Sequence, residues 1–136
     1  MEEIKDPIQF IREHDTFAKL LNIEIIEAAD GCSHVSMPLG KDSCNAVGYV
    51  HGAVFFSLAD VAFAAACNSE GELSVGIECS IQYMAPVKPE GRLHARSKKI
   101  RETRKLGFYR TEITNDDGEI AAVMQSVSFK KGGAEK

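Results

Sequence analysis

The feature that most constrains the fold is a long apolar stretch at residues 51–68, in which Asp60 is the only formally charged side chain. Alanine, phenylalanine, valine and leucine fill most of the other positions. A stretch of this kind is typical of a helix, and a helix that is apolar on every side has to be surrounded by protein. Its least polar part, residues 52–67, is shorter than the roughly 20 residues that a membrane span needs, and it contains Asp60. We therefore expect a buried helix at the centre of the fold.

Strands are expected on both sides of this helix, because apolar and polar residues alternate there. Two precede it, at residues 21–28 and 32–39. Four follow it, at residues 73–84, 92–101, 108–115 and 119–129. Short turns separate successive strands, which favours antiparallel pairing. The sequence thus predicts an α+β architecture, with an antiparallel β-sheet wrapped around a long central α-helix.

The remaining segments fit one domain that spans residues 1–136. Pro7 precedes apolar residues at helical spacing, which predicts an N-terminal helical segment within residues 1–20. Residues 131–136 are expected to form a frayed tail. A chain of 136 residues with 44% hydrophobic content has enough apolar material for its own core.

Composition also argues against several classes of protein. The net charge of −4 argues against nucleic acid as a main partner. The four cysteines form no C-x-x-C pair, so neither a zinc site nor a redox motif is indicated. The N-terminus carries acidic residues where a signal peptide would be basic. We expect a cytoplasmic protein with no membrane partner and no bound metal.

Asp60 is the first candidate for chemistry. A carboxylate in an apolar helix is desolvated unless it is hydrogen-bonded, paired or protonated. One interpretation is structural, with Asp60 satisfying a buried backbone group or facing a subunit interface. The other is a carboxylate tuned by its surroundings to act as a base or nucleophile.

The start of the same helix is the second candidate. His51 and Gly52 mark the end at which free backbone N–H groups and the positive end of the helix dipole meet. An oxyanion could approach closely because Gly52 has no side chain. The alternative is that Gly52 only permits close packing and His51 only caps the helix. With Asp60, the pair describes an acyl-transfer site without a serine or cysteine nucleophile.

The motifs around these residues resemble a known family. The run N-A-V-G-Y-V-H-G-A at residues 45–53 is followed by S-L-A-D ending at Asp60 and by Y-M-A-P beginning at Tyr83. Their order and spacing resemble the hotdog-fold thioesterases of the phenylacetate-degradation (PaaI-like) family, from about residue 20 to residue 129. The resemblance implies a hotdog fold and acyl-coenzyme A thioesterase activity.

The resemblance also implies roles for single residues. Asp60 is expected to act as general base or nucleophile, and the Gly52 N–H is expected to polarise the thioester carbonyl. Asn45 would hold the thioester or the attacking water, and His51 would fix the loop. Tyr83 and Arg101 would bind coenzyme A.

Two positions depart from the pattern of the family. Ala53 stands where a second glycine often follows His-Gly, which is a conservative change. Gly76 stands at a substrate-side position where some relatives carry a hydroxyl that orients water. Ser74 is a candidate substitute, because it lies two residues away on the same expected strand face.

A basic run between residues 88 and 110 has two readings. This segment contains nine lysines and arginines and only two acidic residues, Glu90 and Glu102. It could receive the phosphates of coenzyme A, or it could be a solvated face of the sheet. The acidic pair Asp116 and Asp117 is expected to form a turn.

Three readings of function remain at this stage. The first is a thioesterase that acts on an acyl-coenzyme A, such as an aryl-acetyl or medium-chain ester, without a further cofactor. The second is a non-catalytic acyl-coenzyme A-binding or sensory module of the same fold. The third is a hydratase, for which no Asp/His pair is visible in the sequence. We expect a homodimer as the minimal active unit, assembled as a dimer of dimers into a homotetramer.

Overall fold

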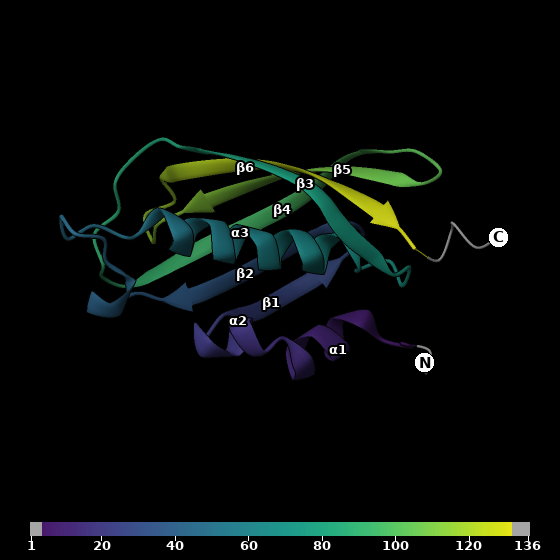
Figure 1. Cartoon of the computed structure of the whole chain (residues 1–136), viewed down its shortest axis with the longest axis horizontal. Helices are drawn as coiled ribbons and strands as arrows, with labels where there is room; N and C mark the ends of the chain where they lie inside the picture. Colours follow the sequence, from purple (N-terminus) through teal and green to yellow (C-terminus); the bar gives the residue numbers. More distant parts are fainter. Residues whose placement is uncertain (1–3, 132–136) are drawn as a thin grey trace.

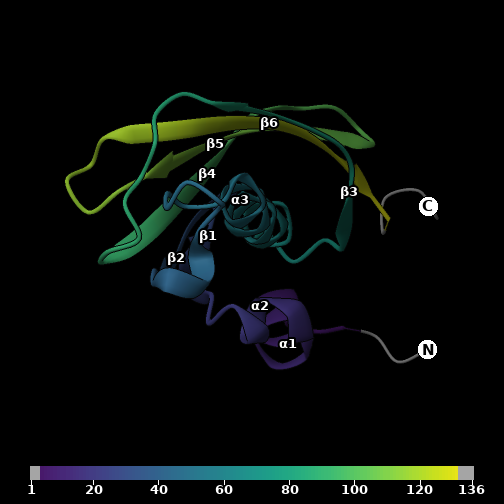
Figure 2. The same ribbon diagram turned by 60° about the vertical axis from the view of Figure 1, so that its left-hand side comes forward.

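Six strands form one antiparallel sheet that curves around a long helix in the computed structural model, which describes residues 4–131 (Figure 1). The helix, α3 (Gly52–Cys67), lies in the concave face of the sheet (Figure 2). Leu58, Ala59 and Ala62 of α3 are fully buried against it. The Ser33 hydroxyl fastens sheet to helix by donating to the Ala62 carbonyl at 2.6 Å. The predicted α+β architecture is confirmed.

The strands pair in an order that differs from their order in the chain. Their bounds are β1 (Glu24–Ala29), β2 (Cys32–Pro38), β3 (Ser74–Tyr83), β4 (Arg92–Glu102), β5 (Leu106–Thr114) and β6 (Ile120–Lys130). Their spatial order is β1-β2-β4-β5-β6-β3. A short 3-10 helix, η1 (Lys41–Ser43), lies in the loop between β2 and α3.

The expectation that each later strand pairs with the next was wrong for β3. The turn before β4 contains Pro86 and Pro89, and it leads from one side of the sheet to the other instead of closing a hairpin. β4 pairs with β2, and β3 pairs with β6 at the far edge. One edge of β3 therefore has no partner strand within the described chain.

The N-terminal segment forms two short helices where one was expected, α1 (Pro7–His14) and α2 (Thr16–Leu20). Asp15 separates them because its carboxylate accepts a hydrogen bond from the Ala18 N–H at 3.0 Å and so caps α2. Both helices lie below the open side of the sheet (Figure 2). Residues 1–3 and 132–136, which include most of the expected frayed tail, lie outside the described residues.

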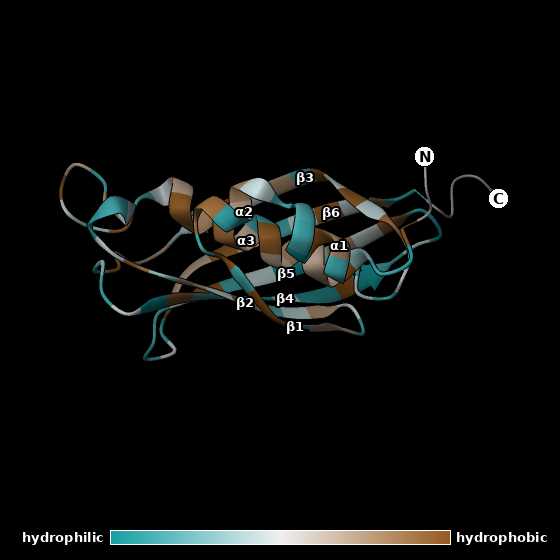
Figure 3. Cartoon of the chain, turned by 90° about the horizontal axis from the view of Figure 1, so that it is seen from below, coloured by the Kyte–Doolittle hydropathy of each residue, from teal (hydrophilic) through white to brown (hydrophobic). Residues whose placement is uncertain are grey.

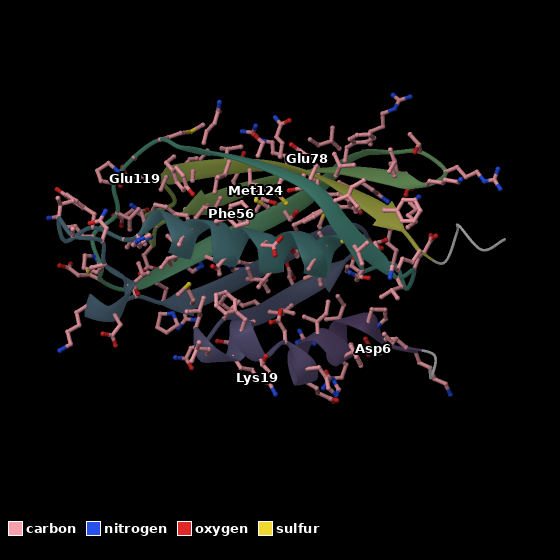
Figure 4. All side chains as sticks on the ribbon, in the orientation of Figure 1. Asp6, Lys19, Phe56, Glu78, Glu119 and Met124 are labelled. Carbon is pink, nitrogen blue, oxygen red and sulfur yellow. The ribbon has the colours of Figure 1, made fainter. Side chains whose placement is uncertain are left out.

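The expectation that α3 is covered on every side was wrong for a single chain. Phe56 and Asp60 lie on an exposed stripe of the helix. Figure 3 shows α3 as mostly hydrophobic, and Figure 4 labels Phe56 on α3 and Glu78 on the neighbouring β3. Among the described residues, no helix is long and apolar enough to cross a bilayer.

Leu58→Ala tests the contribution of the helix–sheet contact. Leu58 is fully buried, so truncation should leave a cavity and lower the free energy of unfolding by about 3 kcal/mol. Leu20→Ala is the matched control, because Leu20 is 75% exposed and should cost little. Urea denaturation of both variants measures the difference. Equal losses of stability would contradict the packing described here.

Candidate active site

Asp60 projects from the exposed stripe of α3 toward β3. Its side chain is within 4.0 Å of the Cys79 thiol on that strand. Although Asp60 is exposed in the single chain, the surrounding apolar groups remove much of its solvent. This desolvation, together with the negative charge of Asp15, raises the pKa of the Asp60 carboxyl above its ordinary value. The carboxyl therefore stays protonated to a higher pH than an ordinary aspartate.

A cavity of about 360 Å³ adjoins Asp60. Its walls come from α1, α3 and the start of β3, and most of them are apolar: Pro7, Phe10, Ile11, Phe63, Ala64, Cys67, Leu73 and Val75. Two polar residues in the walls, Asn68 and Ser74, are already hydrogen-bonded to each other, because the Asn68 amide donates to the Ser74 carbonyl at 3.1 Å. None of the described residues that line the cavity is basic. The cavity thus suits an uncharged apolar group.

The N-terminus of α3 forms the other half of the candidate site. His51 caps the helix, because its Nδ1 accepts a hydrogen bond from the Ala53 N–H at 3.0 Å. Among the described residues, nothing accepts a hydrogen bond from the Gly52 N–H. A Cβ atom on Gly52 would lie 3.3 Å from Tyr83 Cζ, so glycine permits the close approach of that ring. The helix end presents a free donor.

Asn45 is held near this helix end. Its Oδ1 accepts hydrogen bonds from the backbone N–H groups of Val47 and Tyr49, at 3.0 and 3.1 Å. These bonds shape the loop and leave the amide NH₂ group of Asn45 to donate elsewhere. Asn45, Gly52 and Tyr83 line a common pocket of about 340 Å³.

The two halves of the site are separate in one chain. Gly52 and Asp60 are eight positions apart, which corresponds to roughly 12 Å along the helix axis at 1.5 Å per residue. Asp60 lines the apolar cavity, and Gly52 lines the other pocket. A single thioester carbonyl cannot reach both groups on the same chain.

Gly76 cannot carry a side chain without a rearrangement. A Cβ atom there would lie 2.8 Å from Cε2 of Phe63, which fills the space in front of the strand. Ser74 lies on the same strand face, as expected, and both residues line the apolar cavity. It is however held beside Asn68, eight residues from Asp60 on the helix, and its hydroxyl donates to the Glu72 carbonyl.

Arg101 lies far from Tyr83 in the single chain. Tyr83 pairs with Ala122, which pairs with Ile113 on β5, whereas Arg101 pairs with Phe108. Phe108 and Ile113 are five positions apart on β5, which corresponds to roughly 17 Å along the strands at about 3.3 Å per residue. The structure therefore does not bring these two residues together within one chain.

Much of the basic run is paired or lies on the outer face of the sheet. Lys99 bonds to Glu70 and Glu102, and Arg110 lies 3.3 Å from Glu112. A groove on β4 and β5 is lined by Arg96, Lys98, Lys99, Arg110, Glu112, Ser97 and Ile100. In one chain, most of this charge is not next to Asp60 or Gly52.

Two groups near the sheet were missed in the sequence. Cys79 carried no motif that marked it as a neighbour of Asp60. His94 donates or accepts hydrogen bonds with His34 at 3.2 Å and with Asp116 at 2.8 Å, which ties the expected acidic turn to β4. In the part of the chain that the structure describes, no group of three or more potential ligands could hold a metal.

Comparison with known proteins places this architecture in a family. Residues 47–122 match the model of the thioesterase superfamily. The acyl-coenzyme A thioesterase PaaI of Escherichia coli is 35% identical over 121 residues, which cover 89% of this chain and 86% of that protein. Its solved structure superposes with a TM-score of 0.88 and 33% identity, over 93% of this chain and 92% of that chain.

A second solved structure is that of a hypothetical thioesterase protein from Streptococcus pneumoniae with coenzyme A. It is 25% identical, with a TM-score of 0.76 over 81% of this chain and 89% of that chain. The fold is the hotdog fold, and the protein is a thioester hydrolase. The chain belongs to the thioesterase superfamily and is PaaI-like.

Asp60→Asn should raise stability at neutral pH. Because folding raises the Asp60 pKa, the ionised carboxylate destabilises the folded state above that pKa. The penalty disappears as the pH falls below the ordinary value of 3.8. Asn removes the penalty at pH 7 and changes little near pH 3.5. Thermal unfolding at both values measures the effect.

The control for this experiment is Asp117→Asn in the exposed turn before β6, which should change stability little at either pH. A stability gain for Asp60→Asn that is the same at both pH values would contradict the assignment.

Proposed function

We propose that this protein is an acyl-coenzyme A thioesterase whose active site is built from two chains. The observation that carries the proposal is the separation of the free Gly52 N–H from the desolvated Asp60 carboxylate on one helix. The name of the E. coli relative and the coenzyme A in the S. pneumoniae structure support the choice of substrate class.

A two-fold contact that sets two copies of α3 antiparallel would bring Gly52 of one chain beside Asp60 of the other. The surface along α3 and β3 suits such a contact. Exposed apolar side chains gather there: Phe56, Val75, Ile77 and Tyr83. β3 also offers an edge with free backbone groups. We propose a homodimer as the active unit and its pairing into a homotetramer.

The chemistry follows from the two groups. Asp60 takes a proton from water while the water oxygen attacks the thioester carbon, and the Gly52 N–H stabilises the oxyanion. Collapse of the resulting tetrahedral intermediate breaks the carbon–sulfur bond, and the departing thiolate of coenzyme A takes the proton from Asp60. The alternative, in which Asp60 itself attacks and an anhydride is hydrolysed, uses the same groups.

The other site residues would position the substrate. Asn45 would donate its amide to the thioester or the water, and His51 would hold the Gly52 N–H in place by capping the helix. Tyr83 would contact coenzyme A at the helix end, and Arg101 would contact its phosphates. Gly76 would leave room for the Phe63 ring beside the acyl group.

Release of thiol from a panel of acyl-coenzyme A esters tests the activity. The apolar cavity beside Asp60 should favour phenylacetyl or hexanoyl esters over succinyl, whose carboxylate would be buried unpaired, by at least about 10-fold in kcat/KM. Asp60→Asn should lower kcat at least roughly 100-fold, since it removes the base. Binding of these esters by wild-type protein without turnover would refute the proposal.

Complementation tests the shared site. Asp60→Asn and Gly52→Val homodimers should both be nearly inactive. In their heterodimer, one site keeps an intact Gly52 and an intact Asp60, so activity should return to up to half that of wild type. The control is Asp60→Asn exchanged with a tagged copy of itself, which should stay inactive. A purified heterodimer as inactive as its parents would show that each chain forms its own site.

A further inference from the structure

A β-bulge in β3 brings Cys79 next to Asp60. The register with β6 shifts between Gly76 and Glu78, so Cys79 faces the helix although it is three residues from Gly76. The Cys79 thiol can donate a hydrogen bond to Asp60 Oδ1, with a sulfur–oxygen distance of 4.0 Å. This strand thus supplies a donor to the proposed base.

The thiol stays protonated and can act as a donor. Burial raises the pKa of Cys79, and the Asp60 charge adds to the rise, whereas the Ser126 hydroxyl opposes it. Other titratable groups near Asp60 are Asp15, which raises its pKa, and the Cys67 thiol, whose own pKa burial raises to about 12. Neither donates a hydrogen bond to Asp60: the Cys67 thiol donates to the Ala64 carbonyl at 3.6 Å, and the Asp15 carboxylate accepts from the Ala18 N–H.

Ser126 is the second observation. It is the direct partner of Cys79 on β6 and faces the helix from the inner side of the sheet. It is only 3% exposed, and its Oγ forms no hydrogen bond of good geometry with any described residue; the Cys79 thiol is close enough for Ser126 to oppose the rise of its pKa, but not aligned for a hydrogen bond. A buried hydroxyl without a protein partner is usually satisfied by water.

The other routes to a water-orienting hydroxyl are closed. Phe63 occupies the space in front of Gly76, and the Ser74 hydroxyl is held at the far end of the helix. Cys79 and Ser126 are the polar pair that lies level with Asp60.

Building on the proposed function, we propose that Cys79 and Ser126 are the positioning residues of the hydrolytic water. Cys79 orients the Asp60 carboxylate, and Ser126 holds the water that Asp60 activates. They replace the hydroxyl for which Gly76 leaves no room.

Ser126→Ala should lower kcat about 5- to 10-fold with an unchanged KM, the effect of losing one hydrogen bond to the water. Thr114→Val is the matched control and should change neither constant, because Thr114 also has a buried hydroxyl without a partner among the described residues but lies on β5, outside both pockets of the site. Steady-state assays with the best acyl-coenzyme A ester measure both. An unchanged kcat for Ser126→Ala would overturn the role of Ser126.

Cys79→Ala should move the acid limb of the kcat/KM profile to higher pH by about half a unit, because the carboxylate loses a donor. Cys79→Ser keeps a donor and should restore the wild-type limb. A merely structural role would lower activity without moving the limb, and an unmoved limb would overturn the role of Cys79.

An inactive wild type would refute the proposed function itself, whereas an active wild type with normal variants would refute this inference alone.

Discussion

The packing of α3 into the concave face of the sheet determines where every candidate group lies. Burial of residues such as Leu58 and Ala62 fixes the rotation of the helix about its axis. That rotation turns Asp60 toward β3, and it leaves the Gly52 N–H at the open end of the helix. Since α3 is a rigid rod, the distance between the two groups is a property of helix geometry that no loop movement can shorten.

The single chain leaves one apolar surface uncovered. The exposed stripe with Phe56, the exposed Ile77 and the unpaired edge of β3 share one surface, which also carries Asp60. An apolar surface beside a free strand edge is costly to leave in water. A second copy of the chain would cover that surface and complete the site, so the stability of the assembly and its chemistry would depend on the same contact.

The sequence predicted the parts of this fold that depend on local pattern. The helix at residues 51–68, the six strands and the cap at His51 follow from periodicity and end signals. The pairing of β3 with β6 does not, because long-range order depends on the whole sheet. The contact of Cys79 with Asp60 was hidden for another reason: the bulge shifts the alternation by one residue, and strict alternation from Gly76 would have placed Glu78 on that face.

The environment of Asp60 has two different sides. Toward α1 and Phe63 the carboxylate meets an apolar cavity, and toward β3 it meets the Cys79 thiol, whose partner across the strands is Ser126 of β6. An acyl chain is stabilised by burial in the apolar cavity, and on the other side it would leave the polar groups without hydrogen bonds. Water can form hydrogen bonds only with those polar groups. The apolar cavity on one side of Asp60 and the polar groups on the other would therefore place the two reactants on opposite sides of the base.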